Sequence, residues 1–132
     1  MDPLTCMVAA LFFEARDQPI IGQESVAQVV MNRVADERYP DTVCGGVYEP
    51  RQFSFTHDGL SDDPADYPTH FDKIALDHLN ALAKHAISGE MDYTITATHY
   101  HADTVSPFWV ANYEMDGKVG GHVFYTNDTS HK

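Results

Sequence analysis

One glutamate, Glu14, is placed to act as a general acid. At the 100° turn of a helix, Met7, Leu11 and Glu14 fall within one narrow arc, so the carboxyl lies on or beside an apolar face. Burial there disfavours the charged carboxylate and raises its pKa above the ordinary value. A carboxyl that stays protonated near neutral pH can donate a proton in catalysis. The alternative is that Glu14 lies at the edge of this face and simply reaches water.

Three histidines in the last third form a second group of candidate residues. His99 and His101 are two residues apart, so on a strand they would point to the same face. With His122 they could make a three-histidine zinc site, which is the open arrangement of a catalytic metal. The same imidazoles could instead line a sugar-binding cleft or serve as hydrogen-bonded residues of a sheet.

The single tryptophan, Trp109, follows Pro107-Phe108 in a loop-like stretch. An indole exposed there would offer a flat platform for the apolar face of a sugar ring. The alternative is the core, because a lone tryptophan in a small domain usually packs inside.

The charge of the chain excludes some classes of function. Its 132 residues include 8 Lys and Arg against 20 Asp and Glu, which gives a formal net charge of −12. Sequence-independent nucleic-acid binding is excluded because it needs cationic contacts to phosphate, and attraction to anionic lipid is disfavoured as well. No apolar run approaches the roughly 18 residues of a membrane span, so we expect no stable membrane association. Glycine-rich phosphate loops and the Gly-x-Ser-x-Gly nucleophile elbow are also absent from the sequence.

The two cysteines, Cys6 and Cys44, are too few for a disulfide framework and lack metal-ligand spacing. Burial as two small apolar side chains is the favoured interpretation. A single Cys6–Cys44 bridge is the alternative if the protein works in an oxidising compartment. Nucleophilic chemistry at Cys44 is disfavoured, because no thiol-activating environment is recognisable.

Apolar periodicity and capping residues predict four helices in the first two thirds of the chain. Asp2 is expected to cap the first helix and Asp41 the third. In the second helix a valine stripe forms the core side, and Gln23 and Arg33 share that side. The fourth helix is expected to point Phe71, Ile74, Leu79, Leu82 and Ala86 inward. The expected helices span Pro3–Arg16, Gly22–Asp36, Thr42–Tyr48 and Thr69–Ser88, with a loop-like stretch at 49–68.

In the last third of the chain the amino-acid composition becomes typical of β-strands. Tyr93 to Thr98 is rich in β-branched residues and is predicted to continue as a strand to His101. Two further strands, 109–115 and 118–126, flank Asp116-Gly117, which is a strong signal for a two-residue hairpin. We therefore expect one α+β domain over residues 1–132, mostly helical, with a small antiparallel sheet formed by the C-terminal third.

Several runs spread along nearly the whole chain form an ordered pattern. Together they resemble the spore-cortex-lytic enzyme family, the SleB/CwlJ-like cell wall hydrolases, and no single run would suffice. The matching runs are Phe13 to Arg16, Gly22-Gln23, Val26-Ala27, Val29 to Val34, Tyr39 to Tyr48, Gln52 to Phe55, Ala97 to Ala102, Val105 to Trp109 and Gly121 to Tyr125.

This resemblance implies a lysozyme-like catalytic module that acts on peptidoglycan. Members cleave the β-1,4 bond between N-acetylmuramic acid and N-acetylglucosamine, mostly as lytic transglycosylases. The catalytic glutamate falls on Glu14 by the Glu-Ala-Arg match. Two rival interpretations are a zinc-dependent amidase that cuts the muramoyl–alanine bond with the three histidines, and a wall-binding module without turnover.

The resemblance also implies a cleft that binds glycan strands without a metal or another cofactor. It explains the histidines as cleft lining, and no carboxylate that could orient a metal-bound imidazole is recognisable beside them. The residues expected to line the cleft are Gln23, Gln52, Ser54, His99, Tyr100, Trp109 and Tyr125.

The chain departs from the family pattern on both sides of the Glu-Ala-Arg run. Phe13 stands where the family has glycine, and Asp17-Gln18 stands where it has Gly-Glu. Asp17 brings a second carboxylate near Glu14, and a second carboxylate is what ordinary glycoside hydrolysis requires. Other candidates for that second carboxylate are Glu24, Asp103 and Glu114.

The beginning of the sequence, Met1-Asp2-Pro3, lacks the basic segment of a secretory signal. A short module without signal, linker or wall-anchoring repeat is expected to be a phage endolysin more than a spore enzyme. On this interpretation the protein is a monomer, is made in the host cytoplasm, and is released at lysis to act at the cell wall or in the periplasm.

Overall fold

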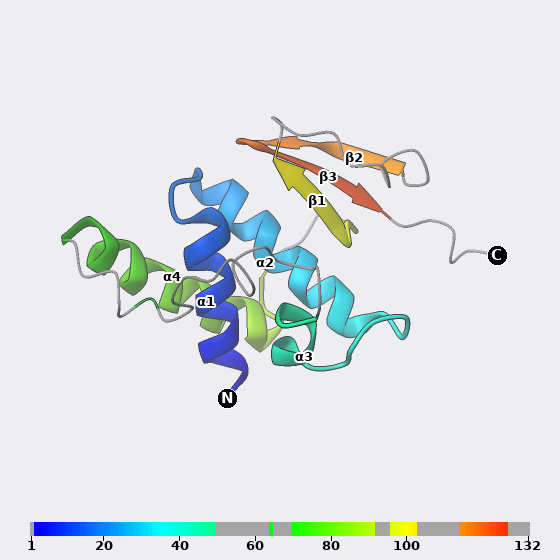
Figure 1. Cartoon of the computed structure of the whole chain (residues 1–132), viewed down its shortest axis with the longest axis horizontal. Helices are drawn as coiled ribbons and strands as arrows, with labels where there is room; N and C mark the ends of the chain where they lie inside the picture. Colours follow the sequence, from blue (N-terminus) through cyan, green and yellow to red (C-terminus); the bar gives the residue numbers. More distant parts are fainter. Residues whose placement is uncertain (1, 50–63, 65–69, 92–95, 103–113, 127–132) are drawn as a thin grey trace.

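The computed structural model describes residues 2–49, 64, 70–91, 96–102 and 114–126, with helices first and strands last (Figure 1). The strands form one antiparallel sheet that lies against one side of the helices. The α+β class expected from the sequence is therefore confirmed. The elements are α1 (Pro3–Ala15), α2 (Ile20–Ala35), α3 (Val43–Val47), α4 (His70–Ser88), β1 (His99–Ala102), β2 (Glu114–Val119) and β3 (His122–Thr126).

Capping side chains set the starts of α1 and α3. The Thr5 backbone N–H donates to Asp2 Oδ1 at 2.7 Å, so Asp2 caps α1 as predicted. In α3 the Gly45 N–H donates to Thr42 Oγ1 at 3.0 Å, so the prediction of Asp41 as the cap is wrong. Asp41 stands one residue too early, because a capping oxygen bonds the N–H two or three residues further on.

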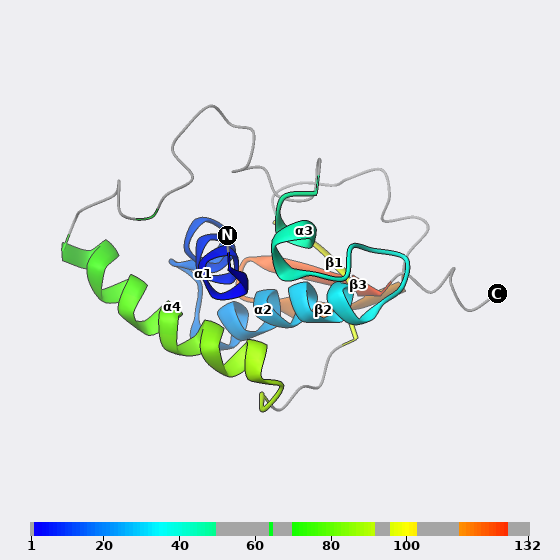
Figure 2. The same cartoon turned by 90° about the horizontal axis from the view of Figure 1, so that it is seen from below.

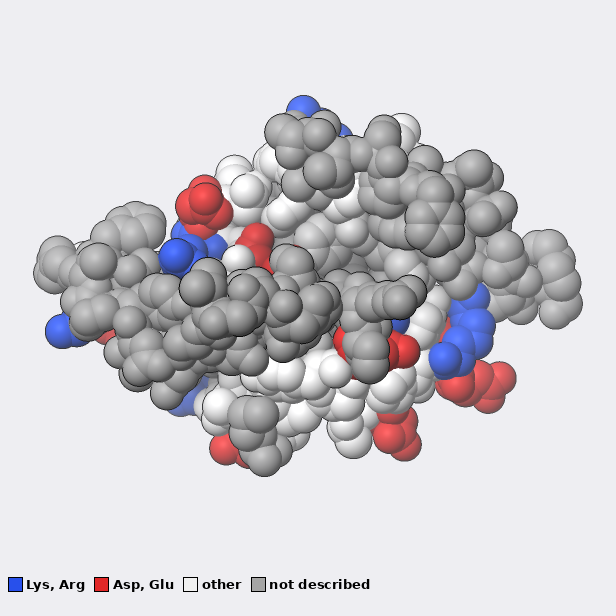
Figure 3. Space-filling model, viewed as in Figure 1, with Lys and Arg blue, Asp and Glu red and all other residues white. Residues whose placement is uncertain are grey.

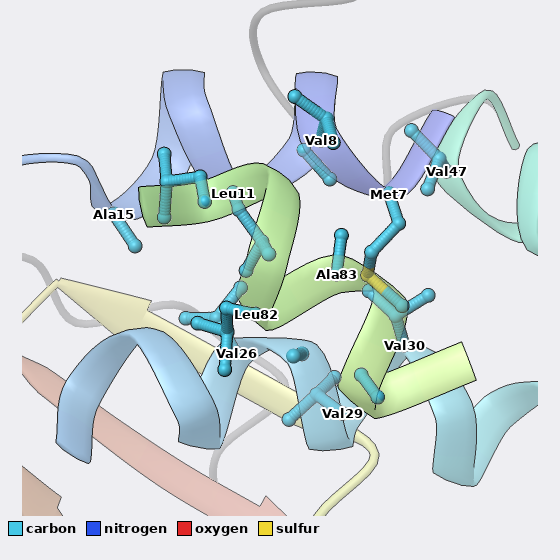
Figure 4. Close-up of a cluster of buried hydrophobic side chains, with 14 of the residues drawn as sticks. Met7, Val8, Leu11, Ala15, Val26, Val29, Val30, Val47, Leu82 and Ala83 are labelled. Atoms are coloured by element: carbon cyan, nitrogen blue, oxygen red, sulfur yellow. The ribbon is translucent and has the colours of Figure 1, made fainter. Parts of the chain in front are cut away.

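Helix α1 is the centre of the helical layer. All residues from Cys6 to Phe12 are buried, so α1 is surrounded by protein instead of presenting one apolar face. It packs against α2, α3 and α4, and Figure 2 shows it nearly end-on beside them. Figure 4 shows the apolar side chains that meet in this core, among them Met7, Leu11, Val26, Val29, Val47, Leu82 and Ala83.

Helix α4 covers α1 through part of the predicted stripe. Leu79, Leu82 and Ala86 are buried, as expected. The prediction for Ile74 is wrong, since its side chain is 58% exposed. At the pitch of an α-helix Ile74 points roughly 140° away from Leu79 around the axis, and so away from α1. The side chain of Phe71 lies outside the described part of the structure.

The two cysteines form a disulfide that joins α1 to α3, with a Cα–Cα distance of 5.2 Å. Cys6 is fully buried and Cys44 is partly buried, so the bridge lies at the edge of the core. The favoured interpretation of two separate buried thiols is therefore wrong. Packing of α3 against α1 brings the two residues within bridging distance, which no local pattern could show.

The sheet has the strand order β1–β3–β2. Val119 pairs with His122, so the hairpin turn is Gly120-Gly121 and the prediction of a turn at Asp116-Gly117 is wrong. Gly120 has φ +57°, which the first central position of a two-residue hairpin turn requires. At Asp116-Gly117 the pairing register shifts, as in a β-bulge. Asp116-Gly117 and Gly120-Gly121 both suit a turn, and the observed register is one in which Phe124 is buried.

Strand β1 begins at His99, later than the predicted start at Tyr93. The preceding carbonyls are bonded by side chains of α2: Asn32 Nδ2 donates to the carbonyl oxygen of Ala97 at 2.9 Å, and Arg33 Nη1 donates to that of Thr98 at 3.0 Å. The Thr98 N–H still donates to the Tyr125 carbonyl oxygen of β3 at 3.0 Å, so this segment is bonded to both the sheet and α2. Residues 93–95 of the predicted strand lie outside the described residues.

Most of the loop predicted at 49–68 and the first five residues of the strand predicted at 109–115 lie outside the described residues. None of the helices described here combines the length and the apolar character needed to cross a membrane.

We expect the disulfide to contribute strongly to stability. It closes a loop between residues separated by 38 positions, and restricting the unfolded chain over such a loop corresponds to about 4 kcal/mol. Denaturant unfolding with and without a reductant measures this contribution. Reduction should lower the unfolding midpoint of the wild type and leave that of a Cys6→Ala/Cys44→Ala variant unchanged. Equal midpoints for oxidised and reduced wild type would show that the bridge does not stabilise the fold.

Candidate active site

Glu14 and Tyr100 come together although 86 positions separate them. Glu14 stands in the last turn of α1 and is half-buried, and Tyr100 stands in β1. The Tyr100 hydroxyl donates a short hydrogen bond to Glu14 Oε1. The predicted catalytic glutamate and one predicted cleft residue therefore belong to the same site.

The surroundings of Glu14 favour its protonated form. Burial raises the pKa of the Glu14 carboxyl above its usual value, and the hydrogen bond from Tyr100 offsets part of that rise. Burial and the neighbouring Glu14 hold the pKa of the Tyr100 phenol well above 10, so this hydroxyl remains a donor. A half-buried carboxyl with a fixed phenol donor is suited to giving up and taking back a proton.

Two rings of β3 pack against Tyr100. The His122 ring centroid lies 4.8 Å and the Phe124 centroid 5.5 Å from that of Tyr100. Tyr100 pairs directly with Phe124 in the sheet, and His122 is two residues away, so all three side chains share one face. His122 and Phe124 are both buried, which holds the phenol toward α1.

His99, His101 and Tyr125 lie on the opposite face. His99 pairs with Tyr125, and His101 Nε2 lies 3.0 Å from the Tyr125 hydroxyl. The three histidines are therefore divided between the two faces of the sheet, and His122 cannot join the other two around one metal ion. Within the described ranges, no group of three or more His, Cys, Asp or Glu side chains could hold a metal.

Arg33 is the residue of this region whose role the sequence analysis missed. It is 4% exposed, and its guanidinium donates to the Thr98 carbonyl oxygen at 3.0 Å and to Glu49 Oε1 at 2.9 Å. The same group lies 3.9 Å from the centroid of the Tyr39 ring. Arg33 thus joins α2 to the segment that enters β1. The sequence feature that could have indicated this role is an arginine on the buried valine side of a helix.

The same guanidinium determines the state of His99. Arg33 Nη1 lies 3.3 Å from His99 Nε2, and Thr98 Oγ1 lies 3.0 Å from Nδ1. Burial, together with the charges of Arg33 and Arg38, lowers the pKa of His99 to about 4. His99 is therefore neutral near pH 7, with Nε2 accepting from Arg33 and Nδ1 carrying the proton.

The structure describes only some of the remaining predicted cleft residues. Gln23 is 5% exposed and both ends of its side-chain amide are hydrogen-bonded. Tyr125 is buried and contacts His101. Gln52, Ser54 and Trp109 lie outside the described residues.

Basic side chains near this region are paired with acids. Arg33 pairs with Glu49, and Arg38 pairs with Asp36. On the face shown in Figure 3 several Lys and Arg side chains likewise lie beside Asp or Glu.

Comparison with known proteins shows the family. The model of a family described as Cell Wall Hydrolase matches residues 17–125. The chain belongs to this cell wall hydrolase family. The match begins after Glu14, so the role of that residue is argued from its geometry and from the resemblance of its motif.

Relatives of this chain include proteins named spore cortex-lytic enzyme. The spore cortex-lytic enzyme of Bacillus cereus is 32% identical over 120 residues, which cover 89% of this chain and 42% of that protein. The spore cortex-lytic enzyme of Halalkalibacterium halodurans is 30% identical over 118 residues, which cover 89% of this chain and 33% of that protein. The chain thus spans less than half the length of these relatives.

Two solved structures have the same fold. The catalytic domain of the germination-specific lytic transglycosylase SleB from Bacillus anthracis is 31% identical, with a TM-score of 0.66, over 94% of this chain and 93% of that domain. The catalytic domain of the Bacillus cereus SleB protein is 30% identical, with a TM-score of 0.65, over 94% of this chain and 89% of that domain. The lysozyme-like α+β fold expected from the resemblance is confirmed.

The departures from the family pattern lie beside the site. Asp17 is exposed in the turn after α1. Gln18 Oε1 accepts from the Gly121 N–H at 2.8 Å, so the loop after Glu14 is joined to the hairpin turn. A Cβ added at Gly120 would lie 2.6 Å from Gln18 Oε1 and 3.0 Å from Pro19 Cδ, and the backbone has φ +57°, so this position favours glycine.

We predict that Tyr100→Phe raises the pKa of Glu14. The phenol donates to the carboxylate and lowers this pKa, so its removal leaves burial as the larger remaining effect. An NMR titration of ¹³C-labelled glutamate carboxyls reads the pKa directly. Tyr125→Phe is the matched control, because it removes a hydroxyl from the other face of the sheet. A Glu14 pKa that is unchanged or lower in Tyr100→Phe would show that the hydrogen bond does not favour the carboxylate.

Proposed function

We propose that this chain is a peptidoglycan-degrading catalytic domain that cleaves the β-1,4 bond between N-acetylmuramic acid and N-acetylglucosamine as a lytic transglycosylase. The observation that carries the proposal is the half-buried Glu14, which has a raised pKa and contacts Tyr100. Membership of the cell wall hydrolase family and the likeness to SleB catalytic domains support the substrate class.

Glu14 serves as both acid and base in this mechanism. Its protonated carboxyl donates to the glycosidic oxygen while positive charge develops at the anomeric carbon of the muramic acid. The bond to the departing N-acetylglucosamine breaks. The resulting carboxylate then removes the proton of the muramic 6-hydroxyl, whose oxygen attacks the anomeric carbon and closes a 1,6-anhydro ring. Glu14 ends protonated again, and acid–base assistance of this kind contributes roughly 10²–10⁴-fold.

The described surroundings of Glu14 favour this single-residue mechanism over hydrolysis. Ordinary glycoside hydrolysis needs a second carboxylate at a set separation from the first. In the part of the chain that the structure describes, the side chain bonded to Glu14 is a phenol. Asp17 is exposed, and Glu24 lies on α2.

Binding of the glycan strand is assigned to five of the cleft residues predicted from the sequence. We propose that His99 and Tyr125 contribute from β1 and β3, and that Gln52, Ser54 and Trp109 contribute from the segments outside the described residues. Peptidoglycan glycan strands are then the partner of a monomeric domain formed by residues 1–132.

The rival amidase function is not supported, because its three histidines lie on two faces of the sheet. A wall-binding module without turnover is separated from an enzyme by the first experiment below. Action at the cell wall follows from the proposed substrate. The phage endolysin role stays a prediction from the sequence.

We predict that Glu14→Gln abolishes peptidoglycan cleavage and leaves the fold intact. The amide keeps the shape of the side chain but cannot transfer a proton, and a neutral group at a half-buried position should not destabilise the protein. The measurement is the loss of turbidity of purified sacculi, with circular dichroism as the check on folding. Glu37→Gln, an exposed carboxyl-to-amide change beyond α2, is the control. A folded Glu14→Gln protein that keeps more than about a hundredth of wild-type activity would contradict the acid–base role.

We also predict the chemical form of the product. An intramolecular 6-hydroxyl reaches effective molarities of about 10⁵–10⁸ M in favourable geometry, far above the concentration of water. Digested muropeptides should therefore end in 1,6-anhydro-muramic acid when examined by mass spectrometry. Reducing-end muramic acid as the main product would contradict the transglycosylase proposal. If Asp17→Gly then restored anhydro ends, Asp17 would be identified as the group that activates water.

A further inference from the structure

The buried side-chain amide of Gln23 connects three helices close to the end of the helix that carries Glu14. Gln23 stands in the first turns of α2 and is 5% exposed. Its Nε2 donates to the carbonyl oxygen of Ala15 at 3.2 Å and lies 3.5 Å from that of Arg16. Its Oε1 lies 3.0 Å from His78 Nε2 on α4. The side chain of Gln23 thus links the end of α1 to α2 and α4.

The two carbonyls belong to the end of the helix that carries Glu14. The last carbonyl groups of a helix have no partner within the helix, so other groups must bond them. The Ala15 carbonyl also accepts from the Gln18 N–H at 2.9 Å. Ala15 follows Glu14 directly, so the bond from Gln23 fixes the backbone of the turn from which the Glu14 carboxyl extends.

The chemistry of this position requires both halves of an amide. Carbonyl oxygens only accept, so the –NH₂ of Gln23 must face Ala15 and Arg16, and its oxygen must accept the proton of His78 Nε2. Both ends are occupied inside the protein, and little of the side chain reaches the surface. A residue that recognises a sugar would instead present a polar end to the cleft.

We propose that Gln23 is a positioning residue for Glu14 and not a ligand of the glycan. It holds the last turn of α1 so that the Glu14 carboxyl stays within hydrogen-bond distance of Tyr100. The proposal rests on the assignment of Glu14 as the proton donor of the proposed function, but its structural part can be measured without any turnover.

The test compares Gln23→Met with Gln28→Met. Methionine keeps the volume of glutamine and removes its hydrogen bonds. Gln28 lies on the same helix and is equally buried, at 4% exposed, so it controls for the loss of a buried glutamine as such. Each variant is assayed for kcat and KM on soluble peptidoglycan fragments and for the pKa of Glu14 by carboxyl NMR.

For Gln23→Met we expect kcat to fall by roughly ten- to a hundredfold with KM nearly unchanged, as for a misplaced catalytic group. The pKa of Glu14 should rise, because the carboxyl loses its contact with the Tyr100 hydroxyl. In a Gln23→Met/Tyr100→Phe protein this pKa should equal that of Tyr100→Phe alone, since both changes remove the same hydrogen bond. Gln28→Met should reproduce neither effect.

Three outcomes would overturn the proposal. One is a raised KM with kcat and the Glu14 pKa unchanged, as expected of a sugar ligand. The second is equal behaviour of the Gln23 and Gln28 variants, and the third is additive pKa changes in the double variant. If Gln23→Met does not fold, Gln23→Asn, which keeps an amide but shortens its reach toward the Ala15 and Arg16 carbonyls, takes its place. An unchanged Glu14 pKa and kcat in that folded protein would likewise overturn the proposal.

Failure of the proposed function would be visible separately. Wild type that leaves peptidoglycan intact, or a fully active Glu14→Gln, would remove the assigned reaction. The coupling between Gln23, Glu14 and Tyr100 would still be measured by the pKa comparison alone.

Discussion

The burial of α1 on all sides is the constraint on which the rest of this structure depends. A helix whose residues from Cys6 to Phe12 are all buried must be covered around its whole circumference. Helices α2, α3 and α4 supply that cover, and the Cys6–Cys44 disulfide fastens α3 to it. The last turn of α1 reaches the sheet, where Glu14 accepts from Tyr100 of β1. A polar carboxyl at the end of an otherwise apolar helix is thereby half-buried.

Polar bonds to backbone groups position the sheet over this helix end. Asn32 and Arg33 hold the carbonyls of Ala97 and Thr98, and Gln18 holds the N–H of Gly121. Each such bond contributes only about 0.5–1.5 kcal/mol net, but each restricts the direction from which the sheet approaches. Tyr100 therefore meets Glu14 at a defined place, which a purely apolar contact between helices and sheet would determine less sharply.

The two faces of β1 carry side chains with different partners and different protonation chemistry. Tyr100 stands on the face shared with His122 and Phe124, and it tunes the pKa of Glu14 from there. His99 stands on the other face, where burial and the charge of Arg33 keep its imidazole neutral. One strand thus places a hydrogen-bond donor to Glu14 on one face and a neutral imidazole, bonded to Arg33 and Thr98, on the other.

The sequence by itself determined the helices, their order and the position of Glu14 near the end of a mostly apolar helix. These features depend on local interactions. Asp2 caps α1 through the N–H of Thr5, three residues further on, and the valines of α2 recur at the spacing of helical turns. The resemblance of short motifs, in order along the chain, also sufficed for the family. Only the tertiary structure decided the partner of Glu14, the pairing of the cysteines, the burial of Gln23 and the separation of His122 from His99 and His101.

The hairpin shows why these features could not be read from the sequence. Asp116-Gly117 and Gly120-Gly121 are both good turns, and a change of register reassigns side chains between the faces of a sheet. The register that forms depends on the space that the packed helices provide for the Phe124 side chain. That space is determined by segments far apart in the chain.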